Sequence, residues 1–333
     1  MHRREAKAGI VDPRDFNRIK VYPATGTLVK ASEDAETLEA EKEWYRRLPK
    51  ELEFVHPRIY ELDQPGSIVM EYLDYPTAHQ LYMTKAASAL EWMHIFETTK
   101  IIMTTLATDR FTINIDIEES EELIKSMYVE KTEKRLNALA KNPIFRPMYL
   151  YDVKINGKKY ISIAEMVDLV RRHAKYNIWP IERAPIIHGD LHLANMLISS
   201  SGDGIKLVDP RGKFGRHVIH GDSRYDMAKL MHSMEGGYDL MIEDAFRVKY
   251  DAQQRSIRYR MDRWSRNRTA EWAFAQVFGE AISRDRKTLT VIEALLFLSM
   301  IPLHTESQQR QLVMLARGYE LMEKALGSAY VRI

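Results

Sequence analysis

Cysteine is absent from this sequence of 333 residues. A disulfide framework and a thiolate metal site are therefore excluded, and the absence agrees with the cytoplasmic location that we predict. Histidine occurs at 11 positions, but no pair of histidines has the spacing of a zinc-binding motif. A reactive site in this chain must therefore be built from carboxylates, amides, hydroxyls and cationic side chains.

An excess of charge of one sign is also absent, because 49 lysines and arginines balance 47 aspartates and glutamates to a net charge of +2. Without a strong overall field, we predict neither a nucleic-acid partner nor a membrane partner. The charged N-terminus has no apolar core and is not expected to be a signal peptide. The most apolar stretch, residues 294–304, is too short to cross a bilayer and predicts a buried helix.

Residues 1–73 are predicted to form a small, sheet-containing lobe that binds a nucleotide. The expected elements are strands at 16–23 and 27–32, a helix at 32–48, and strands at 53–62 and 67–73. Alternation of polar and apolar residues predicts the strands. The helix is predicted from Ser32 as a candidate N-cap, acidic residues in its first turn and arginines in its last turn.

Residues 74–333 are predicted to form a larger, mainly helical lobe with the catalytic and substrate-binding groups. Helices are expected at 77–106, 118–141, 162–175, 222–246, 257–284, 289–300 and 307–326. A hairpin is expected near 149–162, because Asn156-Gly157 between two alternating segments is a strong hairpin signal. The predicted fold class is therefore α+β, with an antiparallel-sheet lobe followed by a helical lobe.

Six arginines lie in residues 255–272, together with Trp264 and Trp272. This segment has two interpretations. It forms a basic face for an acidic partner or a phosphorylated substrate, or it is a solvated helix face whose aromatic residues turn toward the core. We favour the second, because long arginine side chains commonly cover a helix surface while their charged ends stay in water.

The strongest functional signal lies in residues 186–198, IIHGDLHLANMLI. An apolar strand runs into a polar turn that contains Asp190 and Asn195, and a second apolar strand leaves the turn. A further carboxylate, Asp209, ends the next apolar strand in residues 205–212, IKLVDPRG. A turn residue at a strand end would explain any one of these side chains, whereas the three together favour a catalytic site.

Phosphoryl transfer from ATP requires positioned phosphates, metal ions and an acceptor for the hydroxyl proton. Asp190 is suited to be that acceptor, because an ionised carboxylate only accepts hydrogen bonds. Asn195 and Asp209 supply the oxygen ligands that Mg²⁺ prefers. An Asp-x₄-Asn turn followed by a strand-end Asp is also the order of the kinase catalytic loop and the metal-binding aspartate.

The HGDLH motif at 188–192, followed by Asn195, resembles the signature of the aminoglycoside phosphotransferase and choline kinase superfamily, whose fold is bilobal and protein-kinase-like. The resemblance implies that Asp190 is the catalytic base and that Asn195 and Asp209 bind metal. The segments DPRG and GDSRYDMAKL further resemble a bacterial branch associated with capsule or surface-polysaccharide synthesis.

Four further residues are expected around this site in supporting or substrate-contacting roles: His188, His192, Arg211 and Asp226. The resemblance implies that Asp226 supports the catalytic loop from a helix start. His192 is expected to form structural hydrogen bonds rather than to act as a base. Arg211 has two open interpretations, since it suits contact with a phosphate or anionic substrate group and also pairing with a carboxylate such as Asp222.

The resemblance also implies a strand lysine that pairs with a helix glutamate and holds the ATP phosphates. Lys30 is expected to be this lysine, and Glu41 is the favoured partner among the glutamates of the following helix. Adenine is expected to meet the backbone carbonyl of Glu71 and the amide of Leu73. No G-x-G-x-x-G loop precedes Lys30, and a first strand near residues 6–11 stays an open prediction.

The sequence thus predicts an ATP- and Mg²⁺-dependent kinase that phosphorylates a hydroxyl of a small molecule. A sugar or amino-alcohol acceptor is the leading hypothesis, with a link to surface-polysaccharide synthesis that rests on the resemblance. One alternative is an aminoglycoside-type antibiotic phosphotransferase, which the motifs fit equally well. The other is a nucleotide-binding pseudokinase scaffold, which only the missing glycine-rich loop favours.

Overall fold

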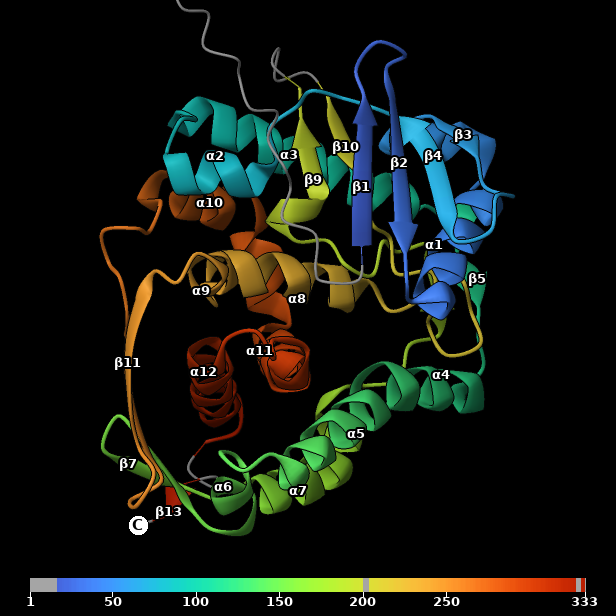
Figure 1. Cartoon of the computed structure of the whole chain (residues 1–333). Helices are drawn as coiled ribbons and strands as arrows, with labels where there is room; N and C mark the ends of the chain where they lie inside the picture. Colours follow the sequence, from blue (N-terminus) through green and yellow to red (C-terminus); the bar gives the residue numbers. More distant parts are fainter. Residues whose placement is uncertain (1–16, 200–203, 328–330, 333) are drawn as a thin grey trace, which may run out of the picture.

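The computed structural model describes residues 17–199, 204–327 and 331–332, and it has an N-terminal lobe built on a sheet and a larger helical lobe (Figure 1). The N-terminal lobe contains β1 (Asn17–Tyr22), β2 (Thr27–Ser32), α1 (Ala35–Arg47), a 3₁₀ turn (Lys50–Val55), β3 (Ile59–Glu61) and β4 (Ser67–Glu71). The sheet is antiparallel in the order β1-β2-β4-β3. The predicted order of strand, strand, helix, strand and strand is confirmed, while the strand near residues 6–11 lies outside the described residues.

Helix α1 begins two residues later than the predicted N-cap would place it. The side chain of Asp34 caps the helix by accepting a hydrogen bond from the Thr37 amide at 3.0 Å. Ser32 was the expected cap, but it is still part of β2, where it pairs with Asn17. The prediction of the cap residue was therefore wrong, although the helix itself is confirmed.

Of the predicted strand at 53–62, residues 53–55 belong to a 3₁₀ turn and only Ile59–Glu61 pairs with β4. Leu52 and Val55 are buried and lie three positions apart, which matches the three-residue period of a 3₁₀ helix rather than the two-residue period of a strand. Pro57 follows and has no amide hydrogen to donate to a neighbouring strand. These two features shorten the strand to Ile59–Glu61.

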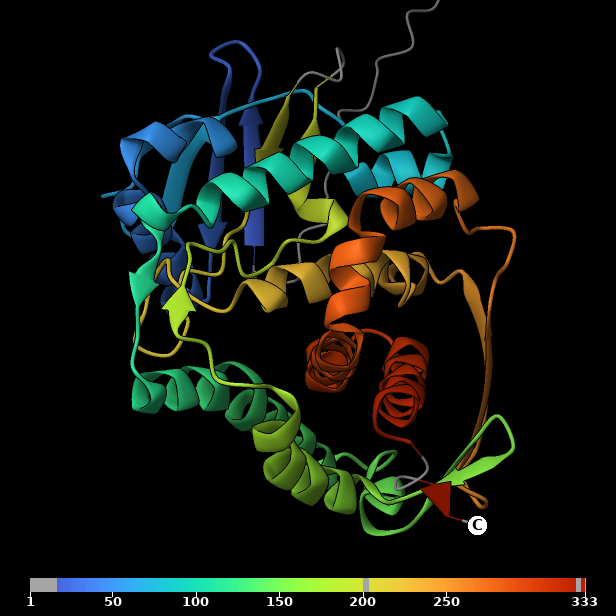
Figure 2. The ribbon, with the colours of Figure 1, turned by 180° about the vertical axis from the view of Figure 1, so that it is seen from behind.

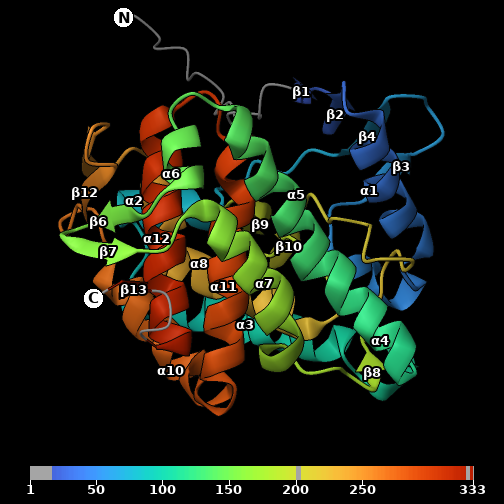
Figure 3. The ribbon, with the colours of Figure 1, turned by 90° about the horizontal axis from the view of Figure 1, so that it is seen from below.

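The helical lobe runs from α2 to the end of the described chain. Its α-helices, with one π-helical segment, are α2 (Ala78–Thr84), α3 (Ala89–Leu106), α4 (Ile117–Ile124), the π-helical segment (Lys125–Glu130), α5 (Lys131–Ala138), α6 (Arg146–Leu150), α7 (Ile163–Asn177), α8 (Ser223–Met234), α9 (Tyr238–Ile242), α10 (Arg268–Arg284), α11 (Arg286–Met300) and α12 (Gln308–Leu326). Figure 2 shows α3 crossing the back of the molecule, where it contacts α10. Figure 3 shows α5 and α7 side by side along the lower face.

Two of the long predicted helices are broken. The helix at 77–106 is interrupted at Lys85, which adopts a left-handed φ of +55°, and a new helix starts at the N-cap Ser88. The helix at 222–246 ends near Gly237, whose φ is +80°, and β11 follows α9. The predicted division of the chain after residue 73 stays a prediction.

The helix predicted at 257–284 was wrong over its first part, because Ser256–Met261 forms strand β12. This strand pairs with β11 (Phe246–Asp251) and with β6 (Val153–Ile155). Isoleucine, tyrosine and methionine alternate with arginine in β12, which is the two-residue period of a strand. The two tryptophans expected to face the core are also exposed, Trp264 by 87% and Trp272 by 51%.

A second sheet has the order β11-β12-β6-β7-β13, with β7 at Lys158–Tyr160 and β13 at Val331–Arg332. Its β6–β7 hairpin confirms the prediction near 149–162, and Asn156 and Gly157 take positive φ angles of +49° and +91°. Two-residue hairpin loops favour such angles. Two further pairs of short strands lie in this lobe, namely β5 (Ile113–Asn114) with β8 (Arg183–Ala184) and β9 (Met196–Ile198) with β10 (Ile205–Leu207).

Helices α8 and α11 form much of the core of the helical lobe. Every residue of α11 from Thr288 to Met300 is buried, and α11 packs against α8, α12 and α5. Figure 1 shows α8 between the N-terminal sheet above and the α11–α12 pair below. Within the described residues, none of the helices combines the length and apolar character needed to span a membrane.

Candidate active site

Strands β9 and β10 bring Asn195 and Asp209 together. The strands pair antiparallel, with Met196 opposite Leu207, so the residues just outside this pair lie next to each other. The amide of Val208 donates to the carbonyl of Asn195 at 3.1 Å and continues the ladder. Local strand pairing thus places Asn195 beside the segment that carries Asp209.

Asp226, near the start of α8, holds the turn that leads to Asp190. Its two carboxylate oxygens accept hydrogen bonds from the amides of His188 and Gly189, each at 2.7 Å. Burial raises the pKa of Asp226 to about 7, although the two amide donors oppose the shift. Hydrogen bonds to a charged group contribute about 1.5–3 kcal/mol each, so this contact fixes the loop firmly.

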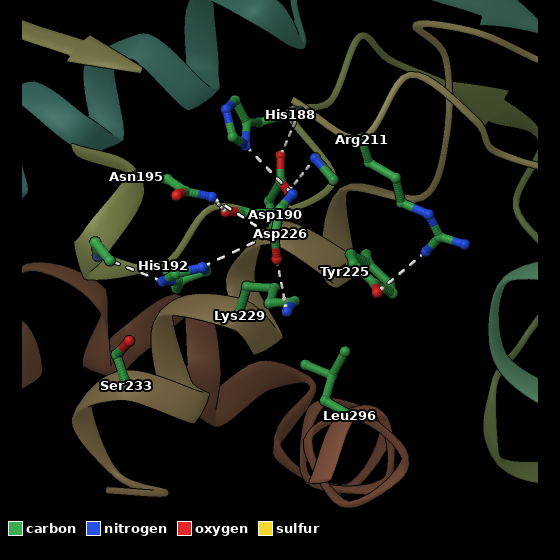
Figure 4. Close-up of polar contacts among 12 residues, drawn as sticks. His188, Asp190, His192, Asn195, Arg211, Tyr225, Asp226, Lys229, Ser233 and Leu296 are labelled. Carbon is green, nitrogen blue, oxygen red and sulfur yellow. Dashed lines mark hydrogen bonds and ion pairs between the residues drawn. The ribbon is translucent and has the colours of Figure 1, made fainter. Parts of the chain in front are cut away.

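Asp190 is surrounded by three side chains from the loop and from α8 (Figure 4). Lys229 on α8 brings its Nζ to 2.6 Å from Asp190 Oδ1. Asn195 donates from Nδ2 to the backbone carbonyl of Asp190 at 2.9 Å and to the side-chain Oδ2 of Asp190 at 3.3 Å. His192 Nε2 lies 3.6 Å from the same Oδ2. The carboxylate is therefore oriented by the protein, yet its side chain keeps 21% exposure.

The two histidines of the loop have structural contacts. His192 accepts a hydrogen bond from the Ala194 amide through Nδ1 at 3.3 Å and caps the short 3₁₀ turn Leu193–Asn195. His188 accepts from the Asp190 amide at 3.2 Å. Burial lowers the pKa of His188 to about 4, so its ring is neutral near pH 7.

Lys30 connects the sheet, α1 and the segment after β10. Its Nζ donates to Glu41 Oε2 at 2.6 Å and to Asp209 Oδ1 at 2.8 Å. The side chains of Lys30 and Glu41 are 7% and 4% exposed, whereas that of Asp209 is 44% exposed. Burial lowers the pKa of Lys30, but the charges of Asp209 and Glu41 outweigh it and raise the pKa above its ordinary value.

Two backbone features hold Asp209 in this position. Asp209 adopts φ +59°, and Gly212 adopts φ +62° with its α-carbon so close to α1 that a Cβ would lie 1.8 Å from the carbonyl oxygen of Ala40. Positive φ is uncommon for residues other than glycine and often marks a functional site. Trp44 of α1 also donates from its indole nitrogen to the carbonyl of Ile187 at 2.9 Å. Helix α1 is thereby fixed to both segments of the site.

Glu71 and Leu73 lie at the end of β4. The amide of Glu71 donates to the carbonyl of Arg58 at 2.8 Å, and the amide of Tyr72 donates to Gly26 at 2.8 Å. For Leu73, the described part of the chain contains no backbone hydrogen-bond partner. The backbone amide of Leu73 is therefore able to donate a hydrogen bond to a ligand.

Arg211 does not pair with Asp222, one of its two predicted alternatives. Asp222 instead accepts hydrogen bonds from Arg224 and from the hydroxyl of Tyr128 at 2.9 Å. Arg211 donates from Nη1 to the hydroxyl of Tyr225 at 3.1 Å. The same hydroxyl accepts a second hydrogen bond, from Lys131 Nζ at 2.8 Å.

Sequence reasoning missed Lys229, Tyr225 and Lys131. Lys229 follows Asp226 by one helical turn, so the two side chains share a face of α8. That spacing was a usable signal, because Asp226 was already expected beside the catalytic loop. Lys131 lies far away in the sequence, on α5, and no local pattern indicates its contact with α8.

A divalent ion at this site would depend on few protein ligands. Among the described residues, no group of three or more histidine, cysteine, aspartate or glutamate side chains is arranged to hold a metal ion. Asn195 uses its amide NH₂ on Asp190, which leaves its side-chain oxygen for a cation, and Asp209 keeps an exposed carboxylate. One carboxylate and one amide oxygen fit Mg²⁺, which in proteins commonly takes its other ligands from phosphates and water.

No family model and no curated protein matches the sequence. Solved structures do match the fold over most of the chain. An ethanolamine kinase from Plasmodium vivax superposes with a TM-score of 0.51 at 12% identity, covering 92% of this chain and 82% of that one. An ADP-bound aminoglycoside phosphotransferase, APH(2'')-Ib, superposes with a TM-score of 0.50 at 11% identity, covering 94% and 93%. The chain therefore has the predicted protein-kinase-like fold, with a small antiparallel-sheet lobe and a larger helical lobe.

Proposed function

We propose that this protein is an ATP- and Mg²⁺-dependent kinase that transfers the γ-phosphoryl group to a hydroxyl of a small molecule. The observation that supports this most is the contact of Lys30 with both Glu41 and Asp209, at 2.6 and 2.8 Å. Kinases use such a lysine, held by a glutamate, to bind ATP phosphates next to a metal-binding aspartate. The ethanolamine kinase and the aminoglycoside phosphotransferase with the same fold act on small molecules, as their names state.

In this proposal each group has a defined task. Asp190 accepts the proton of the attacking hydroxyl and orients its oxygen, as expected of a partly exposed carboxylate held by Lys229 and Asn195. Asn195 and Asp209 hold Mg²⁺, which offsets negative charge on the phosphates when it is bound. Lys30 binds phosphate oxygens. Leu73 and the carbonyl of Glu71 bind adenine through the backbone.

The supporting roles are also part of the proposal. Asp226 holds the loop through the amides of His188 and Gly189, and His192 shapes the turn that carries Asn195. On the resemblance alone, we extend the proposal to a sugar or amino-alcohol acceptor used for surface-polysaccharide synthesis. A pseudokinase scaffold is disfavoured, because Lys30, Asp190, Asn195 and Asp209 are all present and the lysine is already paired.

A turnover assay tests the proposal directly. The purified chain is incubated with ATP and Mg²⁺ and with choline, ethanolamine, hexoses, heptoses or aminoglycosides, and ADP formation and phosphorylated product are measured. We expect acceptor-dependent ADP formation that requires Mg²⁺. ATP binding without turnover of any acceptor class would favour the scaffold alternative.

A further inference from the structure

The side chains of Lys131 and Arg211, near Asp190, converge on the hydroxyl of Tyr225. Lys131 Nζ lies 2.8 Å and Arg211 Nη1 lies 3.1 Å from the hydroxyl oxygen of Tyr225. Within the described residues, neither cation has a carboxylate at ion-pair distance. Partly buried charges without a counter-charge are costly, so a site of this kind has a strong tendency to bind an anion.

The nearby carboxylates are already used by other partners. Asp222 is bound by Arg224 at 2.7 Å and by Tyr128, and Asp190 is bound by Lys229. On the helix that carries Lys131, Glu133 pairs with Arg171. Among the described residues, no carboxylate is therefore available to the Lys131–Arg211 pair, and the acidic group beside the pair is the hydroxyl of Tyr225.

The two cations also have hydrogen-bond capacity left. An arginine has five N–H donors, and Arg211 uses one of them on Tyr225 among the described residues. The oxygen of Tyr225 accepts twice, while its own hydrogen has no acceptor in the described chain. Arginine suits two-point contact with carboxylate and phosphate oxygens. An oxyanion would accept from all three residues together.

The charges around Tyr225 support the same conclusion. Burial raises the pKa of Tyr225, but Lys131, Arg211 and Lys229 outweigh it and lower the pKa to about 7. Burial, and then Arg211, lower the pKa of Lys131 to about 7, against the effect of Tyr225. Near pH 7, Lys131 and Tyr225 therefore compete for one proton, and the charge of Arg211 stays unbalanced whichever of the two holds it. A bound anion would offset this remaining positive charge.

The position of this cluster fits the acceptor rather than the nucleotide. Tyr225 and Lys229 are four positions apart on α8, so they share a face, and Lys229 contacts Asp190. Figure 4 shows Arg211 turned toward Tyr225 on this helix. Lys30, which contacts Asp209, is the cation proposed for ATP. The cluster therefore lies about one turn of α8 from the lysine that contacts Asp190.

A π-helical segment, Lys125–Glu130, directly precedes Lys131 in the continuous helical run from α4 to α5. Such segments add a residue to one turn and therefore rotate the side chains that follow, and they occur frequently at functional sites. Here Lys131 directly follows the π-helical segment, and Lys131 contacts Tyr225 on α8.

We propose that Lys131, Arg211 and Tyr225 bind a carboxylate or phosphate group of the acceptor, so that the molecule phosphorylated is an anionic hydroxy compound. This inference rests on the proposed function. It selects acidic or already phosphorylated sugars over neutral sugars, amino alcohols and aminoglycosides.

Kinetics with matched acceptors test the proposal. Hexoses, hexuronates and hexose phosphates are compared in the wild type, Lys131→Met, Arg211→Met and Tyr225→Phe. Lys125→Met is the control, because Lys125 lies on the same helical run and pairs with Glu130 at the surface. We expect the anionic acceptors to have the higher kcat/KM and Lys131→Met to raise their KM about 10-fold or more, while KM for ATP stays constant.

A binding measurement separates this inference from the proposed function. Calorimetry with inorganic sulfate is carried out on Asp190→Asn, saturated with Mg²⁺ and ADP, with and without Lys131→Met. Sulfate binding that depends on Lys131 supports the anion site even if no acceptor is turned over. Equal kcat/KM for neutral and anionic acceptors, or a rise in the KM for ATP in Lys131→Met, overturns the inference while leaving the kinase proposal intact. If Lys131→Met loses sulfate binding, circular dichroism shows whether the variant is misfolded. Lys131→Gln repeats the measurement with a polar, uncharged side chain.

Discussion

Lys229 on α8 lies 2.6 Å from Asp190 in the loop before β9, and the lysine side chain is only 6% exposed. The same helix holds that loop through Asp226, one turn earlier. A single helix therefore fixes both the backbone of the loop and the carboxylate that points out of it. The orientation of Asp190 depends on α8 as much as on its own motif.

Removal of the Lys229 ammonium should affect the transfer step more than nucleotide binding. Lys229→Met keeps most of the side-chain volume, and we expect kcat to fall about 10²-fold because Asp190 loses its orienting partner. The KM for ATP should change little. Steady-state kinetics measure both values, and Lys229→Arg should recover part of kcat. An unchanged kcat in Lys229→Met would show that Lys229 only fills space.

Glu41→Gln should weaken ATP binding. The amide keeps the shape of the side chain but removes the charge that holds Lys30, so we expect the KM for ATP to rise about 10-fold. Glu39→Gln is the matched control on the same helix, because Glu39 is 56% exposed and pairs with Arg46 at the surface. Equal KM values in the two variants would contradict the role of Glu41.

Gly212→Ala should disturb the contact between the Asp209 segment and α1. Its new Cβ would lie 1.8 Å from the Ala40 carbonyl oxygen, next to Glu41. Gly26→Ala is the control, since Gly26 has the same φ of +62° but nothing within 4 Å. Urea unfolding should give a loss of about 1 kcal/mol for the control and about 3 kcal/mol or more for Gly212→Ala. Similar losses would mean that backbone strain alone decides the effect.

His79 should make the stability of the helical lobe depend on pH. Its Nδ1 lies 2.6 Å from Asp239 and its Nε2 lies 2.9 Å from Glu243. Burial lowers the pKa of His79, but these two carboxylates outweigh it and raise the pKa from 6.5 to about 9. The stabilisation is therefore complete below the unfolded pKa of 6.5 and is lost as the pH rises toward 9.

His79→Gln tests this relation by urea unfolding at low and high pH. The unfolding free energy of the wild type should exceed that of the variant by up to about 3 kcal/mol near pH 6, and the difference should shrink as the pH rises from 6.5 to about 9. His94→Gln, at an exposed position of α3, should show no such change. A difference that stays constant from pH 6 to pH 10 would contradict the ion pairs.

The local patterns of the sequence predicted the elements that depend on local chemistry. Alternation predicted β1 and β2, and Asn156-Gly157 predicted the β6–β7 hairpin. The turn that carries Asp190 and Asn195 was also recognisable, because both residues belong to one short motif between two apolar strands. The strands and the hairpin need no information from distant parts of the chain, whereas the orientation of Asp190 also depends on α8.

The features that the sequence did not reveal depend on tertiary contacts or on unusual backbone angles. Lys85 ends α2 with a left-handed φ angle that glycine normally adopts. Because the residue is a lysine, the residue type did not indicate the helix end. Apolar residues and arginines alternate in β12 as expected of a strand. Because α10 follows closely, the sequence of both elements together resembled one long helix. The contact of Lys131 with Tyr225 joins α5 to α8, and only the packed structure brings them together.

The central claim is that Asp190 accepts the proton of the acceptor hydroxyl, and Asp190→Asn tests it most directly. The variant keeps the shape of the side chain but cannot act as the base. Kinetics with ATP, Mg²⁺ and the best acceptor are combined with ATP binding by calorimetry. We predict that kcat falls about 10³-fold or more while ATP affinity and thermal stability stay close to those of the wild type. Turnover within about 10-fold of the wild type would contradict the account.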